Sequence, residues 1–188
     1  MKNIVIFASG NGSNAQRIAD YFANKPTVSI KKIYSNKADA YVLTRATNLN
    51  IGTLVFTRSD FYESDLVLKE LIKDKPDLIV LAGFLWKIPD PVIAAFNGKI
   101  INIHPALLPG YGGKGMYGAR VHEAVINSGD NESGISIHYV NDRYDEGEII
   151  FQARCMVTPS DTADSLAAKN HELEYEHFPR VIERLLNE

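Results

Sequence analysis

An amide and an imidazole stand two residues apart near the middle of the chain, in the stretch Ile101-Asn-Ile-His-Pro105. The apolar run 99–103 predicts a buried strand, so Asn102 and His104 project from the same face of that strand. An imidazole can transfer protons, and an amide N–H can donate to an oxygen that gains charge. The alternative is a structural asparagine beside a half-buried structural histidine. The stop at Pro105 and the glycine-rich loop Gly110–Gly118 favour a functional site with a mobile lid.

A second candidate feature is the acidic segment Asn141–Gly147, which contains three carboxylates. Such a cluster is usually a solvated loop. It gains a function only if one carboxylate reaches His104, because a carboxylate beside an imidazole orients the ring and favours its charged form.

A third candidate feature is the glycine-rich segment that follows the first apolar run. Gly10-Asn-Gly-Ser-Asn-Ala15 matches the glycine spacing of a dinucleotide-binding turn. That fingerprint also needs an acidic residue at the end of the second strand, and Ile33–Lys37 has none. The remaining prediction is an anion site at a helix N-terminus formed by Gly12, Ser13 and Asn14. The alternative is a plain turn in which Ser13 or Asn14 caps the helix.

The elements that would position these residues alternate between strand and helix. This rhythm predicts an α/β fold, a single-domain Rossmann-like, mostly parallel twisted sheet with helices on both faces, covering residues 1–188. Consecutive strands after residue 133 predict a mixed or antiparallel edge. The final helix contains Pro179, which predicts a kink or a break. The expected strands are 3–8, 28–34, 54–56, 78–82, 99–103, 134–140 and 148–157, and the expected helices are 14–23, 39–49, 61–74, 89–96 and 162–186.

Composition excludes several classes of function. A net charge of −3 provides no basic field for nucleic acid or anionic membrane, and no apolar segment is long enough to cross a bilayer. The histidines show no metal-ligand spacing, and Cys155 is the only cysteine. A lone cysteine indicates a reducing, cytoplasmic compartment. We therefore expect small-molecule ligands and no metal, in a chain that is a monomer or a homodimer.

Five segments together resemble the folate-dependent formyltransferase family over nearly the whole chain. The motif Asn-x-His-Pro-x-Leu-Leu-Pro with a downstream Asp-x-Gly is typical of the superfamily. The opening Gly-Asn-Gly-Ser-Asn resembles the corresponding segment of the members that formylate glycinamide ribonucleotide in purine biosynthesis. The five segments are Gly10–Asn14, Ser35–Asp39, Leu81–Phe84, Ile101–Pro109 and Asp142–Gly147.

The resemblance implies a direct transfer of the formyl group from the co-substrate 10-formyltetrahydrofolate to an amine, through a tetrahedral intermediate and without a metal. It implies that Asn102, His104 and Asp145 are catalytic. It also implies that the substrate phosphate binds Gly12, Ser13 and Asn14, and that His171 and Glu174 meet the ribose. The implied folate-binding residues are Leu85, Trp86, Lys87, Ile88, Asn102, Asp142, Arg143, Tyr144 and Asp145, and Arg58 is a candidate for a ligand contact, with the ligand left open.

Two rival hypotheses remain open at the level of the sequence. The first is a formyltransferase that acts on a tRNA-bound amino acid or on a sugar nucleotide; those enzymes usually carry an extra domain. The second is a dehydrogenase-type nucleotide module built on Gly10–Ala15, which would leave Asn102, His104 and Asp145 without a role.

Overall fold

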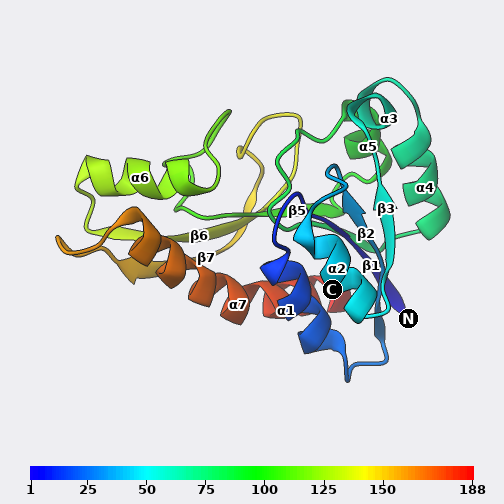
Figure 1. Ribbon diagram of the computed structural model, residues 1–188, viewed down its shortest axis with the longest axis horizontal. Helices are drawn as coiled ribbons and strands as arrows, with labels where there is room; N and C mark the ends of the chain where they lie inside the picture. The colour runs from blue at the N-terminus through cyan, green and yellow to red at the C-terminus, as the bar shows by residue number, and fades with distance from the viewer. The chain divides into compact units, whose positions relative to one another are not determined.

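The computed structural model describes residues 1–188, which divide into two compact units (Figure 1). The first unit holds residues 1–101 and 185–188, and the second holds residues 102–184. Seven strands form one sheet in the order β3-β2-β1-β4-β5-β6-β7. The predicted Rossmann-like, mostly parallel sheet with helices on both faces and a mixed edge is confirmed.

The first unit is built from strands that alternate with helices. β1 pairs in parallel with both β2 and β4, and β2 pairs in parallel with β3. Figure 1 shows α1 beside α2 and α3 beside α4, the pairs that also make contact. The elements are β1 (Lys2–Phe7), α1 (Ser13–Phe22), β2 (Val28–Ser35), α2 (Tyr41–Asn48), β3 (Gly52–Val55), α3 (Arg58–Tyr62), α4 (Leu66–Asp74), β4 (Leu78–Leu81) and α5 (Asp90–Ala95).

The core of this unit is centred on β1, whose residues 4–7 are all fully buried. A strand that is covered on both faces reads as a continuous apolar run, which is why Ile-Val-Ile-Phe shows no alternation. The ring of Phe7 stacks on Tyr34 with centroids 4.8 Å apart. Burial of each such side chain stabilises the fold by about 1.5–3 kcal/mol. The loops that follow β1 and β4 are therefore held on a rigid base.

The second unit contains the predicted hairpin. β5 (Ile100–His104) enters it at Asn102 and is followed by α6 (Ala119–Ser128), β6 (Glu132–Tyr139), β7 (Ile149–Met156) and α7 (Ala163–Asn187). β6 and β7 are antiparallel. Gly134 is required in this pair, because a Cβ there would lie 1.9 Å from the carbonyl oxygen of Ala153. Even the 25-residue α7 is not long and apolar enough to cross a membrane.

Two sequence-based predictions need correction, and one helix was not predicted. The expected helix 61–74 is two helices, because Thr57 and Asp60 form a capping box that starts α3 early, and Asp65 starts α4 separately. Helix α6 was not predicted at all. Of the predicted kink or break at Pro179, the break is wrong, since α7 continues through this residue. Proline removes one backbone hydrogen bond, but burial of Phe178 and Ile182 on either side outweighs that loss.

Candidate active site

The second unit brings three of the predicted site residues together. Asn102 and His104 lie on β5, and Asp145 lies in the loop between β6 and β7. One carboxylate oxygen of Asp145 is 3.7 Å from Nδ1 of His104. The other carboxylate oxygen is 3.6 Å from Nε2 of His138, a residue on β6. The acidic loop therefore does reach the imidazole, which the sequence had left open.

The amide of Asn102 is oriented by His138. Nδ1 of His138 lies 2.9 Å from the carbonyl oxygen of Tyr139, which can only accept, so Nδ1 carries the proton. Burial lowers the pKa of His138, so the ring is neutral and its Nε2 is an acceptor. The side-chain N–H₂ of Asn102 donates to this Nε2 over 3.1 Å. This bond distinguishes the nitrogen of the amide from its oxygen and fixes which way the second N–H points.

The imidazole of His104 is held by a backbone carbonyl. The ring is 4% exposed, and Nε2 lies 2.8 Å from the carbonyl oxygen of Tyr111, to which it donates. Tyr111 has a left-handed backbone (φ 55°), and its hydroxyl is anchored by Ser128 at 2.6 Å and by Asp130 at 2.5 Å. Since Nε2 is occupied, Nδ1 is the nitrogen that can exchange a proton, and Nδ1 is the atom that faces Asp145.

Asp145 occupies a tightly shaped loop but keeps capacity for further contacts. The backbone N–H of Gly113 donates to Oδ2 over 2.9 Å. The two imidazoles at 3.6 and 3.7 Å are beyond ordinary hydrogen-bond length. Gly147 closes the loop, because a Cβ there would lie 1.7 Å from the carbonyl oxygen of Tyr139. The carboxylate can therefore stabilise an imidazolium through its charge.

A buried serine shapes the turn that follows His104. The hydroxyl of Ser136 donates to the carbonyl of Ala106 over 2.7 Å and accepts from the N–H of Leu108 over 2.9 Å. The side-chain amide of Gln152 donates to the same hydroxyl oxygen and to the carbonyl of Leu108. The stop at Pro105 is thus held by side chains from both strands of the hairpin.

Sequence reasoning missed His138, Ser136 and the carbonyl of Tyr111. Ser136 and His138 alternate with isoleucines on β6, so a polar face at period two was the available signal. The role of the Tyr111 carbonyl left no such signal, because it depends on backbone conformation and not on the tyrosine side chain.

The remaining predicted residues of the second unit lie on α7 and in the acidic loop. His171 and Glu174 are three residues apart on α7, which places them on neighbouring positions of one helix face. Glu174 is buried, and the ring of His171 stacks on Tyr175 at 5.9 Å. In the acidic loop, Asp142 and Tyr144 are exposed, and Arg143 pairs with Glu146 at 3.2 Å.

The first unit holds the predicted phosphate loop. Gly12 adopts a left-handed backbone (φ 75°) at the N-cap of α1, and no side chain caps this helix. The alternative in which Ser13 or Asn14 provides the cap is therefore wrong. A Cβ at Gly12 would lie 2.3 Å from Cγ2 of Val42, so only glycine fits the turn. A helix start without a side-chain cap attracts an anion through its N–H groups and dipole.

The segment Leu85–Ile88, predicted to bind folate, also belongs to the first unit. Its backbone is held at both ends: the N–H of Leu85 donates to the hydroxyl of Ser9 over 3.0 Å, and the hydroxyl of Tyr62 donates to the carbonyl of Lys87 over 2.8 Å. Trp86 packs against an aromatic cluster, with Phe56 and Phe61 at 6.1 Å, and Ile88 is buried. Arg58 lies over the ring of Trp86 at 5.9 Å.

Comparison with known proteins identifies consistent relatives. Residues 2–182 match the formyl transferase family. A phosphoribosylglycinamide formyltransferase from Haemophilus influenzae is 39% identical over 188 residues, which cover 97% of this chain and 86% of the relative. The crystal structure of phosphoribosylglycinamide formyltransferase from Streptococcus pneumoniae has a TM-score of 0.87 at 36% identity and covers 99% of both chains. Glycinamide ribonucleotide transformylase 1 from Geobacillus kaustophilus gives a TM-score of 0.89 at 33% identity, also with 99% coverage of both chains.

Proposed function

Since the chain belongs to the formyl transferase family, we propose that it transfers a formyl group from 10-formyltetrahydrofolate to the amine of glycinamide ribonucleotide in de novo purine biosynthesis. The observation that carries this proposal is the convergence of Asn102, His104 and Asp145 in a chain whose relatives bear the name of that activity. The rival dehydrogenase hypothesis would leave this cluster unused.

The proposed reaction proceeds by direct attack of the amine on the formyl carbon. As the tetrahedral intermediate forms, the formyl oxygen gains negative charge. The second N–H of Asn102 and a protonated His104 stabilise that charge, because both are held in place before the reaction begins.

A proton must also leave the attacking nitrogen and reach the folate nitrogen that departs. Nδ1 of His104 is placed for this transfer, since Nε2 is committed to the carbonyl of Tyr111. Asp145 supports the imidazolium by its charge, directly or through a water, across the 3.7 Å between them.

The substrates are proposed to bind on the residues that the sequence singled out. The ribonucleotide phosphate binds Gly12, Ser13 and Asn14 at the start of α1, where the Gly12 N-cap makes no side-chain hydrogen bond. The ribose meets His171 and Glu174. The folate binds the segment Leu85–Ile88 through backbone groups, together with Asn102 and Asp142–Asp145, and no metal takes part.

A spectroscopic assay with a 10-formyl folate donor tests the proposal. We expect turnover with glycinamide ribonucleotide and none with an amino sugar nucleotide or a charged tRNA as acceptor. Turnover with one of those acceptors instead would replace the proposed substrate, and no turnover of the folate donor with any acceptor would contradict the proposed reaction.

One substitution tests the phosphate loop separately. Ser13→Asp places a carboxylate against the phosphate dianion and should raise KM for glycinamide ribonucleotide by about tenfold or more, the factor that corresponds to about 1.4 kcal/mol. Asn24→Asp adds the same charge at an exposed turn and serves as the control. An unchanged KM in Ser13→Asp, together with micromolar binding of NADH to the wild type, would favour the dehydrogenase hypothesis.

A further inference from the structure

We propose that Arg45 is a positioning residue for the substrate phosphate, an inference that rests on the proposed function. Arg45 lies on α2, and its guanidinium hydrogen-bonds to Asn11, the residue before the Gly12 N-cap of α1. Nε donates to the carbonyl oxygen of Asn11 over 2.9 Å, and Nη2 donates to the side-chain oxygen of the same residue over 2.9 Å. One planar group therefore fixes both the peptide and the side chain of Asn11.

The loop that leads into α1 is supported by α2 at three consecutive residues. The N–H of Val42 donates to the carbonyl of Gly10 over 3.1 Å, and the side chain of Val42 fills the space that a Cβ at Gly12 would need. With the hydrogen bonds from Arg45 to Asn11, residues of α2 thus contact three consecutive loop residues, 10–12. The direction of the N–H groups at the start of α1 thus depends on these contacts.

Arg45 is itself held in place, so it can act as a fixed support. Its guanidinium lies 5.0 Å from the centre of the ring of Tyr41, one turn earlier on the same helix. A guanidinium that stacks on a ring and already makes two hydrogen bonds loses little conformational freedom when the substrate binds. Its positive charge also adds to the helix dipole at the same end of α1, where a phosphate dianion would bind.

Arginine is the side chain that this geometry needs. Its N–H donors form a rigid fork, which matches the two oxygens of Asn11, whereas a lysine ammonium is a point charge on a flexible stem. Replacement by lysine therefore separates two contributions: it retains the charge and removes the fork.

The test is steady-state kinetics of Arg45→Ala and Arg45→Lys with both substrates varied. We expect KM for glycinamide ribonucleotide to rise roughly 10-fold to 100-fold in Arg45→Ala, the range for losing charge-assisted hydrogen bonds. Arg45→Lys should recover only part of that loss. In both variants kcat and KM for the folate should stay within about twofold of the wild type, because Arg45 acts on the phosphate loop and not on the reacting atoms.

Two further variants define the controls. Lys25→Ala removes another half-buried cation that lies over a tyrosine, at 3.7 Å from the ring of Tyr21, and should leave all constants unchanged. Asn11→Ala removes one oxygen of the pair, and combined with Arg45→Ala it should cost less than the product of the single effects. Asn11→Ala also keeps the proposal testable if Arg45→Ala folds poorly.

The outcomes separate this inference from the proposed function. If Ser13→Asp raises KM for the ribonucleotide and Arg45→Ala does not, the phosphate loop stands and the role of Arg45 is overturned. If Arg45→Ala lowers kcat and raises both KM values together, the effect is a general distortion and the inference is also overturned. If Ser13→Asp has no effect, the phosphate loop itself is wrong.

Discussion

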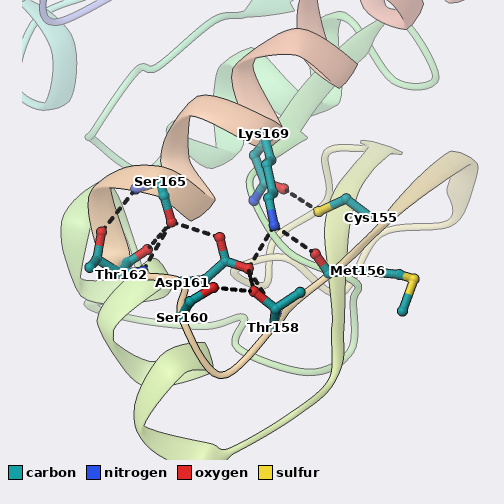
Figure 2. A network of polar contacts seen from close by, with 9 residues as sticks. Cys155, Met156, Thr158, Ser160, Asp161, Thr162, Ser165 and Lys169 are labelled. Atoms are coloured by element: carbon teal, nitrogen blue, oxygen red, sulfur yellow. Dashed lines mark hydrogen bonds and ion pairs between the residues drawn. The ribbon is translucent and has the colours of Figure 1, made fainter.

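Two aspartates of the second unit face cations or imidazoles, yet their surroundings differ. Asp161 is saturated: Lys169 Nζ donates to it over 2.6 Å, Ser165 over 2.7 Å, and Thr158 through both its N–H and its hydroxyl (Figure 2). Asp145 accepts a single hydrogen bond at 2.9 Å from Gly113 and faces two imidazoles at longer range. The carboxylate of Asp161 thus accepts four hydrogen bonds, whereas that of Asp145 accepts one and can accept more.

The number of hydrogen bonds that each carboxylate accepts distinguishes Asp161, which has a structural role, from Asp145, which is proposed to take part in catalysis. The hydrogen bond from Lys169, with those from Thr158 and Ser165, holds the pKa of Asp161 well below its usual range. This group stays charged and holds Lys169 of α7, whose Nζ also donates to the carbonyl of Met156 on β7, while Thr162 caps the helix by accepting from the N–H of Ser165. Asp145 makes only longer contacts to the two imidazoles, so its carboxylate can stabilise a positive charge that forms on His104.

The largest effect is expected from His104→Ala. Loss of a positioned acid–base group should lower kcat by roughly 10²–10⁴-fold. Steady-state kinetics at saturating concentrations of both substrates measures this loss, with a thermal unfolding scan to show that the variant folds. A kcat near that of the wild type would remove His104 from the mechanism.

Asn102→Ala should come next, with a loss on the order of 10²–10³-fold in kcat, as for a missing oxyanion donor. The Asn102→Asp variant has a similar shape but presents a negative charge to the oxyanion, so it should be at least as impaired. Comparing kcat for the two variants checks this point; a more active aspartate variant would contradict the role of the amide as a donor.

His138→Phe should lower kcat on the order of tenfold, the factor for one hydrogen bond of about 1.4 kcal/mol that no longer orients Asn102. His138→Gln supplies an acceptor and should recover part of the loss. Burial lowers the pKa of His138, so the neutral ring is favoured above the ordinary histidine pKa, and the shape of the kcat profile between about pH 7 and pH 8 should not change. Loss of one limb of the profile in His138→Phe would show that this histidine titrates in the reaction.

The smallest kinetic effect is expected from a substitution of Asp161. Asp161→Asn should leave kcat unchanged but lower Tm at neutral pH by roughly 2–4 °C. Because the folded-state pKa of Asp161 is depressed, its contribution is present above about pH 4, the ordinary aspartate pKa, and is lost as pH falls through the folded value. Thermal unfolding of both proteins should show the gap in Tm closing in acid. A gap that widens in acid would contradict the assigned direction.

The sequence predicted the positions of the catalytic candidates better than their supports. Asn102 and His104 could be paired because strand periodicity places residues two apart on one face. The bond between Asn102 and His138 could not be predicted, since it depends on which residue of β6 lies opposite Asn102. The link from Tyr111 to His104 depends on a left-handed backbone, which residue type alone does not specify.

The same limits explain the errors in the fold. Strand and helix alternation was enough to predict the sheet, because each apolar run is short and bounded by polar turns. The prediction of a break at Pro179 was wrong because the packing of α7 outweighs the low helix propensity of proline, and that packing is known only from the tertiary structure. At the phosphate loop, the glycine pattern predicted the turn, but the support from Val42 and Arg45 comes from another helix.

The central claim is that Asp145 acts through His104, and a double-variant cycle tests it most directly. Asp145→Asn keeps the shape and removes the charge that supports an imidazolium, so it should slow the reaction by itself. In His104→Ala the imidazolium that Asp145 is proposed to support is absent, and the remaining imidazole, that of His138, has a pKa lowered by burial. The kcat of the variant that combines His104→Ala with Asp145→Asn should therefore fall much less than the product of the two single losses. Fully multiplicative losses would show that the two residues act independently and would contradict the account.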